Sequence, residues 1–96
     1  MKNISTRVKV KYKGWDYYLH DFIENDKEMQ IVFTSGMTSI YYLYDIKNNK
    51  EYINIDFITV CDDDKDWYLS NINEFKFVAR QFYYKCTGKI LNYENK

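Results

Sequence analysis

The stretch MQIVFTSGMTSIYYLYDI, residues 29–46, decides the fold that this 96-residue chain is expected to adopt. Residues 29–34 and 39–46 are rich in β-branched and aromatic side chains, and Ser35-Gly36 lies between the two runs. In the first run, apolar side chains recur at every second position: Met29, Ile31 and Phe33. Because a period of two is typical of a strand with one buried face, the stretch predicts a β-hairpin.

The residues on both sides of this hairpin continue the pattern. Alternation predicts further strands over residues 6–12, 15–23 and 52–61. Turn-forming sequences separate the strands: Lys13-Gly14, Asn25-Asp26-Lys27 and Lys47-Asn48-Asn49-Lys50. Since short connections join neighbouring antiparallel strands, residues 6–61 predict a curled five-stranded antiparallel meander.

After residue 61 the period changes from two to between three and four. Apolar residues at this spacing form one stripe: Ile72, Phe75, Val78, Ala79, Phe82 and Cys86. The stripe predicts an amphipathic helix over residues 71–87, with Ser70 as its N-cap and Gly88 just beyond its end. The expected fold class is therefore α+β, with the antiparallel sheet packed by one C-terminal helix. We expect a single compact domain over residues 1–96.

Composition narrows the class of protein. Fourteen Lys and Arg balance fourteen Asp and Glu, which excludes a chain that is basic or acidic throughout. Aromatic residues make up one fifth of the chain, and Tyr and Trp suit half-hydrated binding surfaces. We find no uncharged run long enough to span a membrane and no apolar signal segment at the N-terminus. A cytoplasmic protein with no membrane partner is expected.

The residues that could carry chemistry are few. His20, Cys61 and Cys86 show no local catalytic motif and no metal-ligand spacing, so we predict no catalytic residue, no metal and no cofactor. Reduced, buried thiols are expected, although a single disulfide between the two cysteines remains open. The acidic run at residues 62–66 matches part of a calcium loop. However, Trp67 stands where that loop needs Gly, and Asn73 stands where it needs Glu. The run favours a solvated acidic loop, with a weak cation site as the alternative.

The helix face opposite the apolar stripe offers the sharpest hypothesis. Its aromatic residues flank an arginine, and Tyr and Arg are enriched at interface hot spots. The expected partner-binding residues are Lys76, Phe77, Arg80, Gln81 and Tyr84, with Trp67 and Tyr68 at the edge. The alternative is that the C-terminal tail covers Phe77 or that the helix is buried on both sides.

These observations favour a small non-enzymatic protein-binding module. More than half of the residues belong to types with A/T-rich codons, and the chain is short. Both features fit an accessory protein of a phage or mobile element that binds and blocks a larger host protein in a bacterial cell. A homodimer is also open, through an exposed sheet edge carrying Tyr41, Tyr42 and Tyr44.

Two other functions remain as alternatives. A nucleic-acid-binding protein would use a basic strand that contains no acid, with contacts from Arg7, Lys9, Lys11 and Lys13, and exposed aromatic side chains that stack on bases. Its binding would weaken steeply with salt. A metal-independent ribonuclease toxin, with His20 as the acid or base, is less favoured because zero net charge does not suit a basic substrate cleft.

Overall fold

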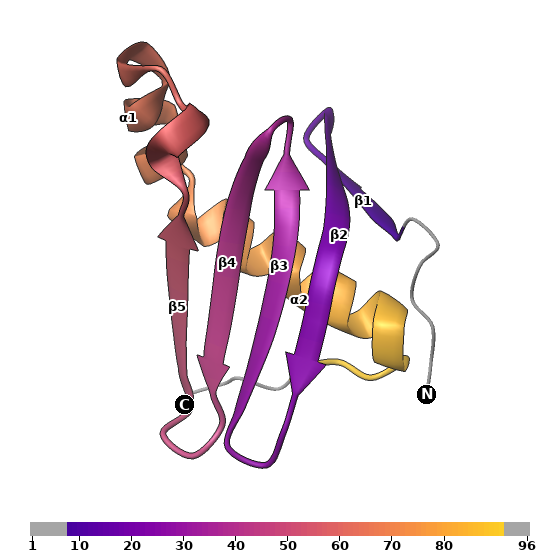
Figure 1. The fold of residues 1–96 in the computed structure, drawn as a ribbon. Helices are drawn as coiled ribbons and strands as arrows, with labels where there is room; N and C mark the ends of the chain where they lie inside the picture. The colour runs from indigo at the N-terminus through magenta and orange to yellow at the C-terminus, as the bar shows by residue number, and fades with distance from the viewer. Residues whose placement is uncertain (1–7, 92–96) are drawn as a thin grey trace.

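The computed structural model describes residues 8–91, and it confirms the α+β class with an open antiparallel sheet. The helices follow the strands in the chain (Figure 1). In chain order the elements are β1 (Lys9–Tyr12), β2 (Trp15–Glu24), β3 (Glu28–Ser35), β4 (Thr38–Asp45), β5 (Lys50–Ile55), η1 (Phe57–Thr59), α1 (Asp62–Ser70) and α2 (Ile72–Thr87).

The strands form the expected meander, with the order β1-β2-β3-β4-β5. Turn chemistry explains the tightest connection, because Lys13 and Gly14 both adopt positive φ, at 53° and 85°, between the paired residues Tyr12 and Trp15. A two-residue turn with positive φ at both positions matches the twist of its flanking strands. The part of the first strand predicted within residues 6–7 lies outside the described residues.

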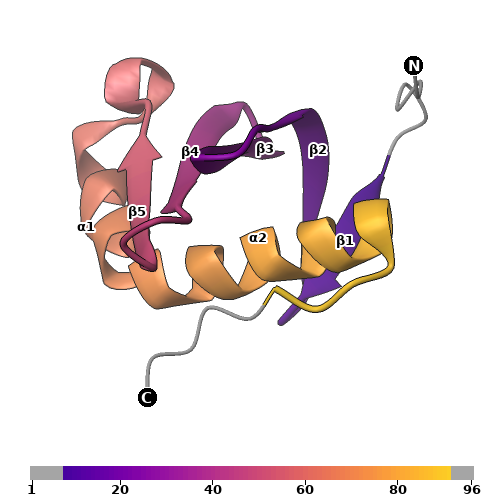
Figure 2. The ribbon, with the colours of Figure 1, turned by 90° about the horizontal axis from the view of Figure 1, so that it is seen from below.

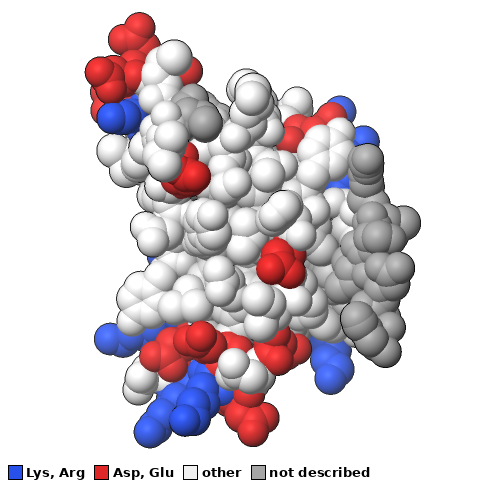
Figure 3. All heavy atoms as spheres, in the orientation of Figure 1, with Lys and Arg blue, Asp and Glu red and all other residues white. Residues whose placement is uncertain are grey.

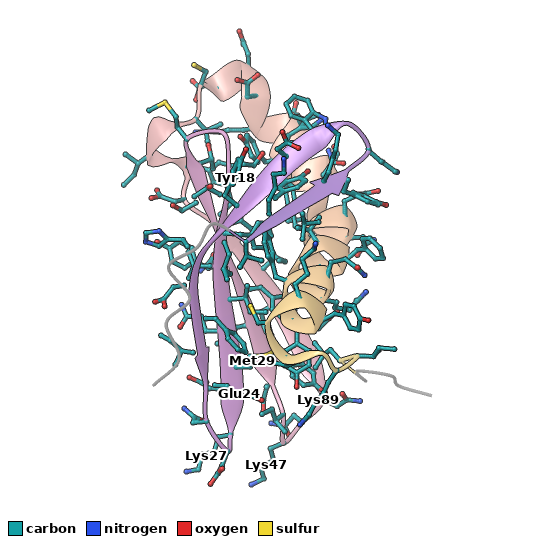
Figure 4. All side chains as sticks on the ribbon, turned by 90° about the vertical axis from the view of Figure 1, so that its right-hand side faces the viewer. Tyr18, Glu24, Lys27, Met29, Lys47 and Lys89 are labelled. Carbon is teal, nitrogen blue, oxygen red and sulfur yellow. The ribbon has the colours of Figure 1, made fainter. Side chains whose placement is uncertain are left out.

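Helix α2 packs against one face of the sheet and supplies the burial that a bare meander lacks. The sheet curves over the helix, which runs obliquely beneath it (Figures 1 and 2). Seen from the side, Met29 lies between the sheet and α2, whereas Lys27 and Lys47 lie at the lower end of the sheet (Figure 4). The predicted stripe is confirmed at its centre, since Phe75, Val78, Ala79 and Phe82 are fully buried.

The end of α2 is also as predicted. Gly88 is the C-cap residue, with a φ of 76° and a backbone N–H that donates to the Tyr84 carbonyl. This left-handed conformation is open to glycine without a steric penalty, so the helix ends here. The predicted N-cap is wrong: α2 is capped by Asn71, without a side-chain hydrogen bond, and Ser70 ends α1.

Strand β2 contains an irregularity that the alternation does not reveal. Its register with β3 shifts between Leu19 and Asp21, which leaves His20 at a bulge. The shift exchanges the two faces of the strand. Phe22 therefore pairs with Ile31 and turns its ring edge-on to Tyr83. Ile23, the next residue, becomes exposed.

The structure corrects three further expectations. The acidic loop predicted at residues 62–66 is wrong, because these residues begin α1, where Asp62, Asp63 and Asp64 suit the positive end of the helix dipole. Strand β5 ends at Ile55 rather than at residue 61. The tyrosines predicted at an exposed edge lie on β4, which is an inner strand, and Tyr42 and Tyr44 point into the core. The described sheet edges are β1 and β5.

The outer face of the sheet, opposite α2, is largely uncharged over its centre, and charged residues gather towards its ends (Figure 3). The register places several exposed aromatic and aliphatic residues on this face: Tyr18, Ile23, Tyr41 and Tyr52. Within residues 8–91, neither helix is long and apolar enough to cross a bilayer.

Candidate functional site

The outward side of α2 carries a groove that we name the α2 groove. It is lined by Phe77, Arg80, Gln81, Tyr84, Ile90 and Leu91 and has a volume of about 390 Å³. Phe77 and Tyr84 lie seven positions apart on α2. Their side chains remain 38% and 51% exposed, so both aromatic rings contact solvent. The helix supplies four of the walls, and the chain that turns back after Gly88 supplies the other two.

Four residues expected at a partner surface thus line one groove, and a fifth, Lys76, is half-buried on the same helix. Of the C-terminal tail, the structure describes Ile90 and Leu91, which line the groove with Phe77 and leave its side chain 38% exposed; the rest of the tail lies outside the described residues. Leu91 packs against the core, whereas Ile90 stays exposed beside the groove. The Phe77 ring also packs on Tyr12 of β1, with 4.8 Å between the ring centroids. The groove therefore has one aromatic wall that is held in place by the sheet.

Arg80 forms the floor of the groove through a paired guanidinium. Its Nε and Nη2 atoms donate to Oε2 and Oε1 of Glu51, both at 2.8 Å, in a bidentate pair. The Tyr42 hydroxyl donates to the same carboxylate at 2.7 Å. The Glu51 side chain is only 1% exposed, and a buried carboxylate needs such partners. Arg80 consequently ties α2 to β5, a role that the sequence did not indicate.

Burial also keeps the Tyr42 hydroxyl, which bonds to Glu51, in its protonated form. The pKa of Tyr42 is raised far above its usual value, mainly because the buried hydroxyl would lose hydration on ionising. The hydrogen bond to Glu51 and the charge of that carboxylate raise the pKa further. Tyr42 therefore remains a hydrogen-bond donor at neutral and moderately alkaline pH.

Trp67 and Tyr68 lie away from the α2 groove. They line a second hollow of about 380 Å³, which we name the tryptophan pocket. The residues that line this pocket are Trp15, Ser35, Gly36, Asp64, Trp67 and Tyr68. Side chains from the β1–β2 hairpin, from the end of β3 with its following turn, and from α1 line this pocket. The rings of Trp67 and Tyr68 also contact Phe75 on the buried face of α2, with centroid distances of 5.9 and 6.0 Å. The structure therefore divides the expected partner-binding residues between two sites.

Of the basic residues proposed for nucleic-acid contact, Lys9 and Lys11 lie on β1 and Lys13 lies in the turn that follows, and two of these three are engaged. Lys11 lies 3.8 Å from Asp16, and Lys13 lies 3.5 Å from Glu74. Lys9 is exposed, and Arg7 lies outside the described residues. Lys11 of β1 thus pairs with Asp16, its cross-strand neighbour on β2. The local positive charge available to a phosphate backbone is reduced accordingly.

The side chains considered for catalysis do not line either hollow. His20 is exposed on β2, Cys61 precedes α1, and Cys86 lies in the last turn of α2. No disulfide joins the two cysteines, and the expected burial is wrong for Cys61, which is exposed. Over residues 8–91, no group of three or more His, Cys, Asp or Glu side chains is placed to hold a metal ion.

Several residues of these sites were missed in the sequence. Ile90 and Leu91 complete the α2 groove, and Trp15 completes the tryptophan pocket. The available signal for Trp15 was its position beside a tight turn, where a large apolar side chain has little room for burial.

Comparison of the chain with known protein families, curated proteins and solved structures finds no match.

Proposed function

We propose that the protein is a non-enzymatic protein-binding module that receives an apolar segment of its partner in the α2 groove. The observation that supports this proposal is the placement of Phe77 and Tyr84 as exposed aromatic walls around a fixed arginine. Aromatic side chains bury much surface for little conformational entropy, and Tyr and Arg are enriched among hot spots.

The bidentate pair with Glu51 strengthens the argument. A free arginine loses side-chain entropy when a partner immobilises it, but Arg80 is already held at two atoms. The groove is therefore preorganised at its floor and at Phe77, where Tyr12 supports the ring. The partner groups that fit such a groove are aliphatic or aromatic side chains flanked by backbone groups that bond Gln81.

The test compares two pairs of substitutions. Phe77→Ala combined with Tyr84→Ala removes both aromatic walls, whereas Tyr18→Ala combined with Tyr52→Ala removes two similarly exposed rings from the outer sheet face. Proteins captured from the native host by the unaltered chain would be identified, and their binding to each variant would be measured by calorimetry. The groove variant is expected to bind at least about thirtyfold more weakly, since it loses two rings that each contribute about 1–2 kcal/mol.

The control pair is expected to bind like the unaltered protein. Equal affinity of the groove variant would contradict the proposal, as would an equal loss in the control. Thermal unfolding of both variants separates loss of binding from loss of fold, because Phe77 also packs on Tyr12. The narrower idea, that this is an accessory protein of a phage or mobile element that blocks a larger host protein, rests on size and composition and stays a prediction.

A further inference from the structure

We infer that the tryptophan pocket binds an organic cation of the quaternary ammonium class, independently of the α2 groove. Aromatic faces carry negative electrostatic potential, which attracts a cation lying within about 6 Å of the ring centroid. Two indole rings and a phenol ring line the pocket, and one carboxylate, that of Asp64, stands beside them.

The aromatic rings of the pocket pack against one another at large angles. Trp15 and Trp67 lie 5.3 Å apart between ring centroids and are tilted by 51° to each other. Tyr68 stands perpendicular to Trp67, at 88° and 4.9 Å. The three rings are therefore in contact with one another and form one continuous aromatic wall, whose faces and edges point in different directions. A rounded cationic group would lie against this wall, beside Asp64, and not between the rings.

The walls are also fixed before any ligand arrives. The Tyr68 hydroxyl donates to Thr38 Oγ1 at 3.2 Å, and both Trp67 and Tyr68 rest on the buried ring of Phe75. Trp15, by contrast, is 54% exposed and forms the outer wall. A pocket with two rigid walls and one accessible wall can accept a ligand with little rearrangement.

Charge around the pocket selects for a cation. Helix α1 contributes Asp62, Asp63, Asp64 and Asp66 against one Lys65. Lys65 pairs with Asp62 at 3.1 Å, and among residues 8–91 no side chain pairs with the Asp64 carboxylate. An anion would be repelled by Asp64, and a neutral ligand would gain no charge–charge attraction from it.

Hydration then decides which cation fits. A lysine ammonium is compact and strongly hydrated, so it gives up much solvation on entering an aromatic site. A trimethylammonium group spreads its charge over methyl groups and combines apolar contact with attraction to the rings. The volume of about 380 Å³ is within the range of small-molecule sites and leaves room for the chain that carries the group. Free choline and a trimethylated lysine of a peptide share this chemistry.

The chain offers a direct readout, because its two tryptophans are Trp15 and Trp67 and both line the pocket. The full-length protein would be titrated with choline, with a peptide containing trimethyllysine, and with 3,3-dimethylbutan-1-ol, a neutral compound of the same shape as choline. The signals to follow are tryptophan fluorescence and the NMR resonances of the two indole N–H groups. We expect saturable binding of the cations, with a dissociation constant on the order of millimolar for choline, and none of the neutral compound.

Three variants make the test specific. Trp15→Ala removes the exposed wall and is expected to weaken choline binding about five- to tenfold, with Trp67 as the remaining reporter. Asp64→Asn removes the carboxylate and should weaken binding while reducing its dependence on salt. Tyr84→Ala, which removes a similarly exposed ring from the α2 groove, should leave the affinity unchanged.

Tighter binding of the peptide would assign the trimethylammonium group to a protein partner, and tighter binding of choline would assign it to a small molecule; both results support the pocket. Equal responses to choline and its neutral analogue would overturn the inference. Unchanged affinity in Trp15→Ala, or an equal loss in Tyr84→Ala, would also overturn it. These outcomes do not depend on whether a protein partner occupies the α2 groove.

Discussion

At the scale of single residues, the link between Arg80 and Glu51 is the feature on which both the fold and the α2 groove depend. It joins the middle of α2 to the start of β5, and its carboxylate is buried. The Glu51 carboxylate accepts hydrogen bonds from both Arg80 and Tyr42, and both bonds offset the loss of hydration on burial. Breaking a buried pair from one side usually costs more than replacing both members.

We predict that Arg80→Met destabilises the protein by about 3 kcal/mol, the lower end for a buried pair, because the arginine side chain is 29% exposed and water can reach the carboxylate once it is gone. Urea unfolding followed by circular dichroism measures the effect. The matched control combines Arg80→Met with Glu51→Leu and Tyr42→Phe, which removes the charge, its partner and the buried hydroxyl that would otherwise lose its acceptor. Recovery of most of the stability in the triple variant is expected, and an equal loss in both variants would contradict the argument.

Tyr42 gives the same link a pH dependence. Its pKa is raised above the usual value of about 10, so the folded state keeps the hydroxyl proton at a pH where the unfolded chain has lost it. The stabilisation from neutral Tyr42 is therefore complete below about pH 10 and is lost as the pH rises further. We predict that Tyr42→Phe loses less stability than the unaltered protein between about pH 9 and 11. Parallel urea titrations at each pH provide the comparison, and identical slopes would refute it.

At the scale of elements, the C-terminal end of α2 permits a clean test. A Cβ added at Gly88 would meet no atom within 4 Å, so the only obstacle to a side chain is its φ of 76°. We predict that Gly88→Ala destabilises the protein by about 1 kcal/mol and lowers the Tm by about 5 °C. Gly88→Asn should lose less, because asparagine tolerates the left-handed region. Equal losses in the two variants, measured by calorimetry, would place the cause in packing instead.

The helices and strands that could be predicted from the sequence were those in which apolar residues recur at a regular spacing. Strands β2 to β4 and helix α2 lie within about two residues of the predicted bounds, because one face of each is buried against the other layer. Helix α1 was missed because it has no buried residue and its apolar side chains, Trp67, Tyr68 and Leu69, are consecutive rather than spaced. The bulge at His20 was missed because an extra residue leaves local alternation nearly intact.

The sites were harder to predict than the elements. Four residues of the α2 groove lie on one helix, so their spacing of three and four brought them together in the sequence. The pairing of Arg80 with Glu51 spans 29 positions and has no local signal. The tryptophan pocket joins β2, the β3–β4 turn and α1, and its geometry depends on how the sheet curls. Long-range proximity of this kind follows from tertiary packing and not from period or spacing.

At the scale of the whole molecule, one hydrophobic core joins the sheet to α2. Its buried members come from β1 to β4 and from α2, and the partly buried residues packed against it include Ile53 of β5 and Trp67 of α1. Every described element except η1, α1 and β5 therefore contributes fully buried side chains to one cluster. A single shared core usually unfolds as one cooperative unit.

We predict that urea unfolds the protein in one two-state transition. Tryptophan fluorescence reports on the corner where Trp15 meets Trp67, whereas far-ultraviolet circular dichroism reports on all strands and helices. Because Trp67 rests on the fully buried Phe75, the corner should be lost together with the core, and the two curves should have the same midpoint. A fluorescence midpoint at lower urea would show that α1 detaches first, and Phe75→Leu would then leave that first transition in place. If the corner is instead part of the core, Phe75→Leu shifts both curves together, by about 1 kcal/mol.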